Sequence, residues 1–60
     1  MHLLSMIERY LSESGITPSR FGRDAMGDPG FVATLRRGRL PRDGTIERVT
    51  AYIRAARAAR

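Results

Sequence analysis

The side chains with chemical capability in this 60-residue chain are its arginines. All eleven basic residues are arginine; with six acidic residues, the net charge is +5. Four arginines fall within seven residues with no acidic residue among them, at Arg36, Arg37, Arg39 and Arg42. A guanidinium group donates through a planar fork that matches phosphate oxygens and the acceptor edge of guanine. The cluster and a pI near 11.4 therefore indicate contact with a polyanionic partner.

No other group of residues has the spacing of a reactive site. The chain has no cysteine, which excludes disulfides and zinc-thiolate sites, and His2 is its single histidine. Glu8 and Glu13 are five apart on an expected helix, so they do not stack as a catalytic pair and are expected to be solvated. A chain this short rarely encloses a pocket for a small ligand. We therefore expect no enzyme activity, no cofactor, no metal and no small-molecule ligand.

The length and hydropathy pattern indicate one small domain without a membrane segment. At 60 residues burial on folding is limited, so stability depends on packed short helices, a partner or dimerisation. The apolar start at Leu3 and Leu4 is interrupted by Ser5, Glu8 and Arg9, which is inconsistent with a signal peptide or a membrane span. We expect a cytoplasmic, nucleoid-associated protein.

The elements that position the arginines are four helical segments, and no strand is predicted. Apolar residues at helical spacing predict a first helix containing Leu3, Ile7, Tyr10 and Leu11, which ends at Gly15. A last helix is predicted over about 43–58, capped by Asp43 or Thr45. Its inward stripe is expected to consist of Ile46, Val49, Ile53 and Ala56.

Two short helices between them carry a repeated start signal, a capping side chain followed by proline. Thr17–Pro18 predicts a helix to about Ala25 or Met26, and Asp28–Pro29 predicts a second helix to about Arg37, stopped by Gly38. The connection is about three residues long, which is typical of a helix-turn-helix unit. Gly22 inside the first of these helices costs about 1 kcal/mol relative to alanine. That cost suggests that the backbone of another helix approaches closely there.

Residues 16–53 resemble the DNA-binding domain of the Cro and phage-repressor (Xre-like) helix-turn-helix family. The resemblance covers about two thirds of the chain without an insertion. It rests on a large and then a small residue, buried positions, a cap, a terminating glycine and a loop proline: Phe21, Gly22, Ala25, Asp28, Val32, Leu35, Gly38 and Pro41.

The resemblance implies an all-α, lambda-repressor-like compact bundle of four to five short helices, with residues 1–60 as one domain and the helix-turn-helix unit at about 17–38. Segment 29–37 would enter the major groove, while segment 18–26 would cross the phosphate backbone. The outward face would carry Pro29, Gly30, Ala33, Thr34 and Arg37. Backbone contacts would fall to Thr17, Ser19 and Arg20, with Arg36, Arg39 and Arg42 as further phosphate contacts. Pro29 and Gly30 have no side-chain donor, so direct base readout would rest mainly on Thr34 and Arg37.

These features predict a small, sequence-preferring protein that binds double-stranded DNA and regulates transcription. We expect a homodimer or a protein partner, with the first helix or the Tyr52, Ile53 and Ala56 face of the last helix as the dimer surface. The alternative is a protein-interaction adaptor that docks on RNA polymerase, another regulator or a toxin. A third reading is nucleoid or RNA binding without sequence preference. The pattern also leaves Phe31 open between the core and the DNA-facing surface.

Overall fold

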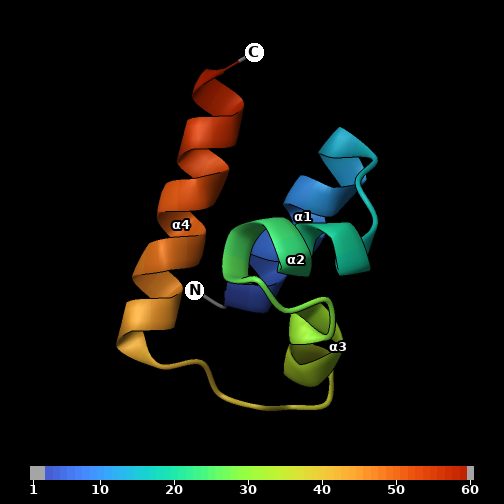
Figure 1. The fold of residues 1–60 in the computed structure, drawn as a ribbon, viewed down its shortest axis with the longest axis vertical. Helices are drawn as coiled ribbons and strands as arrows, with labels where there is room; N and C mark the ends of the chain where they lie inside the picture. Colours follow the sequence, from blue (N-terminus) through green and yellow to red (C-terminus); the bar gives the residue numbers. More distant parts are fainter. Residues whose placement is uncertain (1–2, 60) are drawn as a thin grey trace.

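Four α-helices follow one another along the chain in the computed structural model, which describes residues 3–59 (Figure 1). They are α1 (Leu3–Ser14), α2 (Pro18–Met26), α3 (Phe31–Arg36) and α4 (Asp43–Ala58). The described part of the chain contains no strand, so the all-α prediction is confirmed. His2 and Arg60, the latter in the basic tail, lie outside the described residues.

The core lies where the four helices meet and includes Phe21, which is 1% exposed. The Phe21 ring lies 5.7 Å from the ring of Tyr10 on α1 and 5.6 Å, edge to face, from that of Tyr52 on α4. Such tilted and edge-on pairs are the favoured geometry of aromatic rings. The buried residues are those at helical spacing in the sequence: Leu3, Ile7, Tyr10, Leu11, Phe21, Ala25, Val32, Leu35, Val49 and Ile53.

The turn between α2 and α3 is tight because glycine stands at two positions where another residue would be strained or would clash. Gly27 ends α2 in the left-handed region at φ 67°, and its N–H donates to the Arg23 carbonyl at 2.9 Å. A Cβ on Gly22 would lie 2.3 Å from the carbonyl oxygen of Asp28. The close approach predicted at Gly22 is therefore present, but the neighbouring backbone belongs to the turn, not to a helix.

The predicted start of the third helix is wrong by two residues. The Asp28 carboxylate accepts from the Gly30 N–H at 3.0 Å, and the Asp28 carbonyl accepts from the Phe31 N–H, also at 3.0 Å. These two bonds close a turn in which Pro29 and Gly30 remain outside α3, and Gly30 takes the N-cap position. Asp28 therefore fixes the turn instead of capping the helix. α3 ends at Arg36, one residue before the predicted end.

The last helix, α4, spans the predicted residues, but its N-cap residue and the residues that face the core differ from the prediction. Its N-cap is Arg42, without a side-chain hydrogen bond, and Asp43 is the first helical residue. There the Asp43 carboxylate interacts favourably with the helix dipole. Ile46 is 38% exposed, whereas Val49 and Ile53 are buried and Thr45 is half-buried. The side of α4 that faces the core therefore begins at Thr45, four residues before Val49, and not at Ile46.

One of the two predicted dimer surfaces belongs to the core. Ile53 is buried, Tyr52 packs on Phe21, and Ala56 is partly buried against the same cluster. This face of α4 is therefore covered by α2 and α1 of the same chain and is not free for a second copy. Over residues 3–59, no helix combines the length and apolar character needed to cross a membrane.

Candidate nucleic-acid interface

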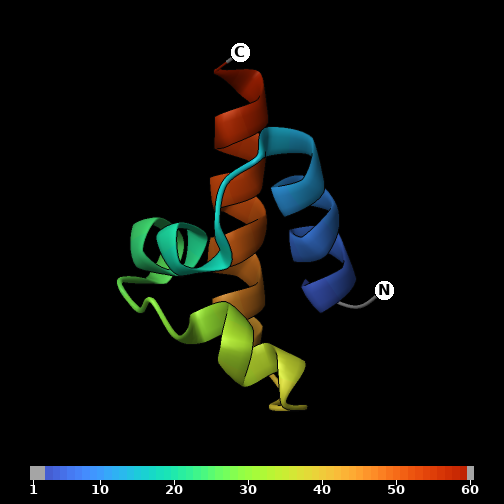
Figure 2. The same cartoon turned by 90° about the vertical axis from the view of Figure 1, so that its right-hand side faces the viewer.

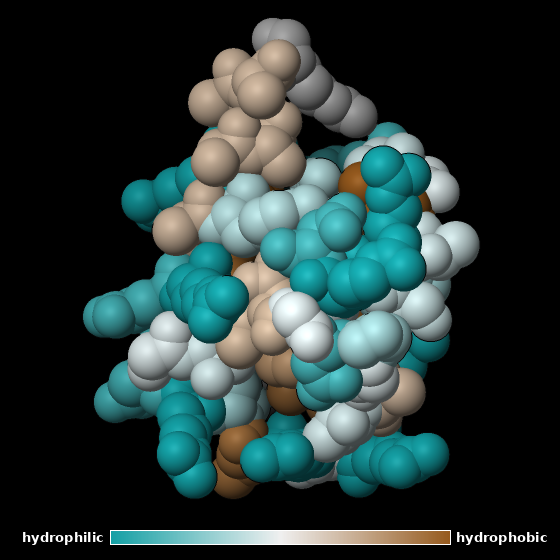
Figure 3. All heavy atoms as spheres, in the orientation of Figure 1, coloured by the Kyte–Doolittle hydropathy of each residue, from teal (hydrophilic) through white to brown (hydrophobic). Residues whose placement is uncertain are grey.

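Three arginines without an ion-pair partner among the described residues lie close together at one end of the molecule. Arg37 is the C-cap of α3, Arg39 lies in the following loop, and Arg42 is the N-cap of α4. All three are exposed. Figure 3 shows hydrophilic side chains along the lower end, over α3 and the loop that follows it. Positive charge is therefore left uncompensated beside α3.

The face of α3 opposite the core carries small side chains and one charged donor, the guanidinium group of Arg37. Val32 and Leu35 are buried, whereas Ala33 and Arg37, four residues apart, are exposed on the same side. The Thr34 hydroxyl donates to the Gly30 carbonyl at 2.9 Å. The hydroxyl proton is therefore already bonded to the backbone. The Thr34 side chain can still accept a hydrogen bond through its oxygen and make an apolar contact through its methyl group. Of the two residues expected to read bases, only Arg37 keeps its donors free.

α2 packs against α3, and it lies above α3 in Figure 1 and above it and to the left in Figure 2. Thr17 caps α2 by accepting from the Arg20 N–H at 3.2 Å, and Pro18 is the first helical residue. Ser19 is exposed beside this cap. Arg20 pairs with Asp24 at 3.6 Å, so its charge is partly compensated. The amides of the first turn form the positive end of the helix dipole.

Arg36 is set apart from the other arginines of the cluster. Its guanidinium forms a two-pronged pair with Glu8 on α1, at 2.8 and 2.7 Å. The hydrogen bond from Arg36 holds the pKa of Glu8 below its usual value, and the same bond raises the pKa of Arg36. Arg36 therefore joins α3 to α1, on the flank of α3 away from Arg37.

A second acidic residue of α1 makes a similar connection to α4. Glu13 accepts from Arg57 at 2.8 Å and from Arg9 at 3.3 Å, and the bond from Arg57 lowers the pKa of Glu13 most. Both carboxylates are exposed, as expected for solvated charges, but each also links α1 to another helix. Periodicity contains no signal for pairs separated by 28 and 44 residues. Sequence reasoning therefore missed both.

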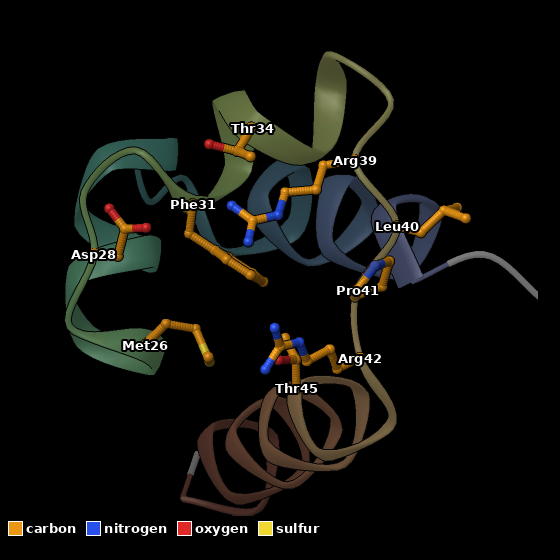
Figure 4. Close-up of a pocket in the computed structure, with 9 residues that line it drawn as sticks. All are labelled: Met26, Asp28, Phe31, Thr34, Arg39, Leu40, Pro41, Arg42 and Thr45. Carbon is orange, nitrogen blue, oxygen red and sulfur yellow. The ribbon is translucent and has the colours of Figure 1, made fainter.

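A hollow of about 340 Å³ lies between the helix-turn-helix unit and the start of α4 (Figure 4). Phe31 is half-buried, packs against the core and also lines this hollow, which answers the question left open by the sequence. Arg39, Arg42 and Thr34 lie on other parts of its wall. The sequence predicted no such hollow, since it forms only where the loop 39–42 returns past α3 toward α4.

In comparisons with known proteins, no protein-family model, no curated protein and no solved structure matches this chain. Residues 3–59 contain no group of three or more histidine, aspartate or glutamate side chains able to hold a metal ion.

Proposed function

We propose that this protein binds double-stranded DNA as a small transcription regulator, with α3 in the major groove. The observation that carries the proposal is that Arg37, Arg39 and Arg42 are exposed, unpaired among the described residues, and adjacent to the small outer face of a helix-turn-helix unit. The resemblance of residues 16–53 to Xre-like domains favours the same function.

In the proposed complex, α3 approaches the groove through its small outer face. Gly30 and Ala33 allow a close approach of backbone and groove, and Arg37 donates to a guanine edge or a phosphate. Arg39 and Arg42 neutralise phosphates on one side, while the capped amino end of α2, with Thr17 and Ser19, faces a phosphate on the other. Phosphate contacts outnumber base contacts in this arrangement, so DNA shape would contribute to recognition.

The test is a fluorescence anisotropy titration with mixed-sequence duplex DNA between about 50 and 200 mM salt. We expect log Kd to rise linearly with log salt, with a slope of several units. The double variant R37A/R39A should bind more weakly. Its slope should be smaller by roughly 0.9 if Arg37 contacts a guanine edge and by roughly 1.8 if it contacts a phosphate, since each phosphate contact contributes about 0.9.

The matched control for each single variant, R37A or R39A, is R54A, which removes one exposed, unpaired arginine on α4 distant in sequence from the cluster. R54A should keep nearly the parent affinity. No duplex binding by the parent protein at about 50 mM salt contradicts the proposal. Equal losses in R54A and in single variants of the cluster would show that net charge alone is responsible.

The adaptor function keeps one specific observation in its favour. Leu40, between Arg39 and Pro41, is 87% exposed, and a large apolar side chain in this position suits a protein contact. The variant L40S separates the two functions, because duplex affinity should remain unchanged while a protein contact through the loop would be weakened.

A further inference from the structure

The hollow between α3 and α4 is lined by two cationic groups of the loop 39–42 that are three residues apart in the sequence. In Figure 4 the guanidinium groups of Arg39 and Arg42 both point into the enclosed space, while Leu40 between them points away. Neither guanidinium has a carboxylate within ion-pair distance among the described residues. Two like charges converge on one volume, and an anion placed between them would relieve their repulsion.

The opposite wall of the hollow is apolar. The ring of Phe31 and the thioether of Met26 point into the same space (Figure 4). Both side chains are half-buried and fixed at the edge of the core, so their exposed atoms form a stable surface. A thioether and an aromatic ring are favourable neighbours for a planar ring.

The remaining polar groups of the wall do not compensate the arginines. The Asp28 carboxylate accepts from the Gly30 N–H at 3.0 Å and lies beside the turn, at the far side of the hollow from Arg42. The Thr34 hydroxyl donates to the Gly30 carbonyl. The volume of about 340 Å³ lies in the range of small-molecule sites, which pair an apolar wall with a few polar groups.

We propose that this hollow binds an aromatic organic anion, a planar ring that carries a carboxylate or a phosphate. The anionic group lies between Arg39 and Arg42, and the ring lies against Phe31 and Met26. This is a ligand site separate from the outer face of α3, although it uses two of the arginines assigned to phosphate contact.

A consequence follows that rests on the proposed DNA binding. A ligand that occupies Arg39 and Arg42 removes both from the DNA backbone, so it competes with the duplex. The occupied protein would lose two phosphate contacts and would bind DNA more weakly, which makes the hollow a regulatory site for a chain that has no second domain among its described residues.

Binding to the free protein is tested first, without DNA, by ¹H–¹⁵N NMR titration of the full chain. The probes are AMP, as an aromatic phosphate, and benzoate, as an aromatic carboxylate. Adenosine, which lacks the charge, and inorganic phosphate, which lacks the ring, are the matched part-probes. We expect at least one aromatic anion to bind about tenfold more tightly than both part-probes, with shifts at the amides of residues 31, 34, 39 and 42.

Variants then test the anion-binding part and the ring-binding part of the site separately. R42Q should weaken binding of that probe about tenfold, because it removes a charge-assisted contact, whereas R54Q on α4 should leave binding unchanged. F31L should weaken it about three- to tenfold through loss of ring contact. R42Q alters an exposed side chain outside the core, so it retains the fold and remains decisive should F31L unfold.

Two results overturn the proposal. One is that neither AMP nor benzoate binds more tightly than inorganic phosphate and adenosine; the other is that R42Q and R54Q weaken binding equally. Competition is measured separately, as the rise in apparent Kd for duplex DNA when the probe is added. Absence of duplex binding would contradict the proposed function but leave the NMR result intact, whereas duplex binding unaffected by a bound probe would contradict only the competition.

Discussion

At the residue scale, the most constrained position of the helix-turn-helix unit is Gly22. A Cβ there would lie 2.3 Å from the Asp28 carbonyl oxygen and 3.2 Å from the Cβ of Phe31. The carbonyl belongs to the backbone of the turn and cannot rotate away as a side chain would. We expect G22A to lower the free energy of unfolding by about 1–3 kcal/mol, because the turn must shift. Urea denaturation followed by circular dichroism measures this change.

Gly44 supplies the control for that prediction. It lies in the first turn of α4, and a Cβ there meets no atom within 4 Å. Its φ is not positive, so alanine fits the backbone without strain. G44A should therefore raise the free energy of unfolding by roughly 0.4–1 kcal/mol, through the reduced entropy of the unfolded chain. Stabilisation by both substitutions would contradict the close approach at Gly22.

At the scale of the elements, the sequence predicts the helices well because their signals are local. Apolar spacing relates residues three or four positions apart, and the Thr17–Pro18 start and the Gly15 and Gly38 stops each involve one or two adjacent residues. The predicted start of α3 is wrong because the Asp28 carboxylate can either cap a helix or close a turn. In the structure it accepts from the Gly30 N–H and closes the turn. The links from α1 to α3 and α4 were missed because they join residues far apart in sequence.

Those links predict a dependence of stability on acidic pH. Bonds from Arg36 and Arg57 hold the pKa values of Glu8 and Glu13 below the usual 4.5 in the folded chain. A carboxyl group with a lowered folded pKa contributes stability that is fully present above its unfolded pKa. That contribution is lost as the pH falls through the folded pKa.

The measurement is Tm as a function of pH from about 6 to 2, for the parent and for E8Q/E13Q. The parent should have the higher Tm at pH 6, and the difference should shrink as the pH falls below 4.5. The parent and the variant share every other titratable group, so the difference in Tm between them reports the two carboxylates. A difference in Tm that stays constant down to the lowest pH would contradict the role assigned to these two pairs.

At the scale of the whole molecule, the distribution of charge decides how many arginines are available to the surface proposed to bind DNA. The basic cluster is a run of neighbouring arginines in the sequence, and only the folded chain divides it. Arg36 is bound to Glu8, while Arg37, Arg39 and Arg42 remain unpaired among residues 3–59. Glu8 therefore withholds one cation from the surface proposed to bind phosphate.

Substitution of Glu8 separates that local effect from the net charge. E8Q raises the net charge from +5 to +6, since one carboxylate is lost, and it also releases Arg36. E47Q makes the same change of charge on α4, where Glu47 has no ion pair among the described residues. We expect E8Q to bind duplex DNA more tightly than E47Q, with a salt slope steeper by up to about 0.9, the contribution of one phosphate contact. Identical slopes in the two variants would mean that Arg36 does not reach the DNA once it is released, and that Arg37, Arg39 and Arg42 are the only members of the cluster that contact phosphate.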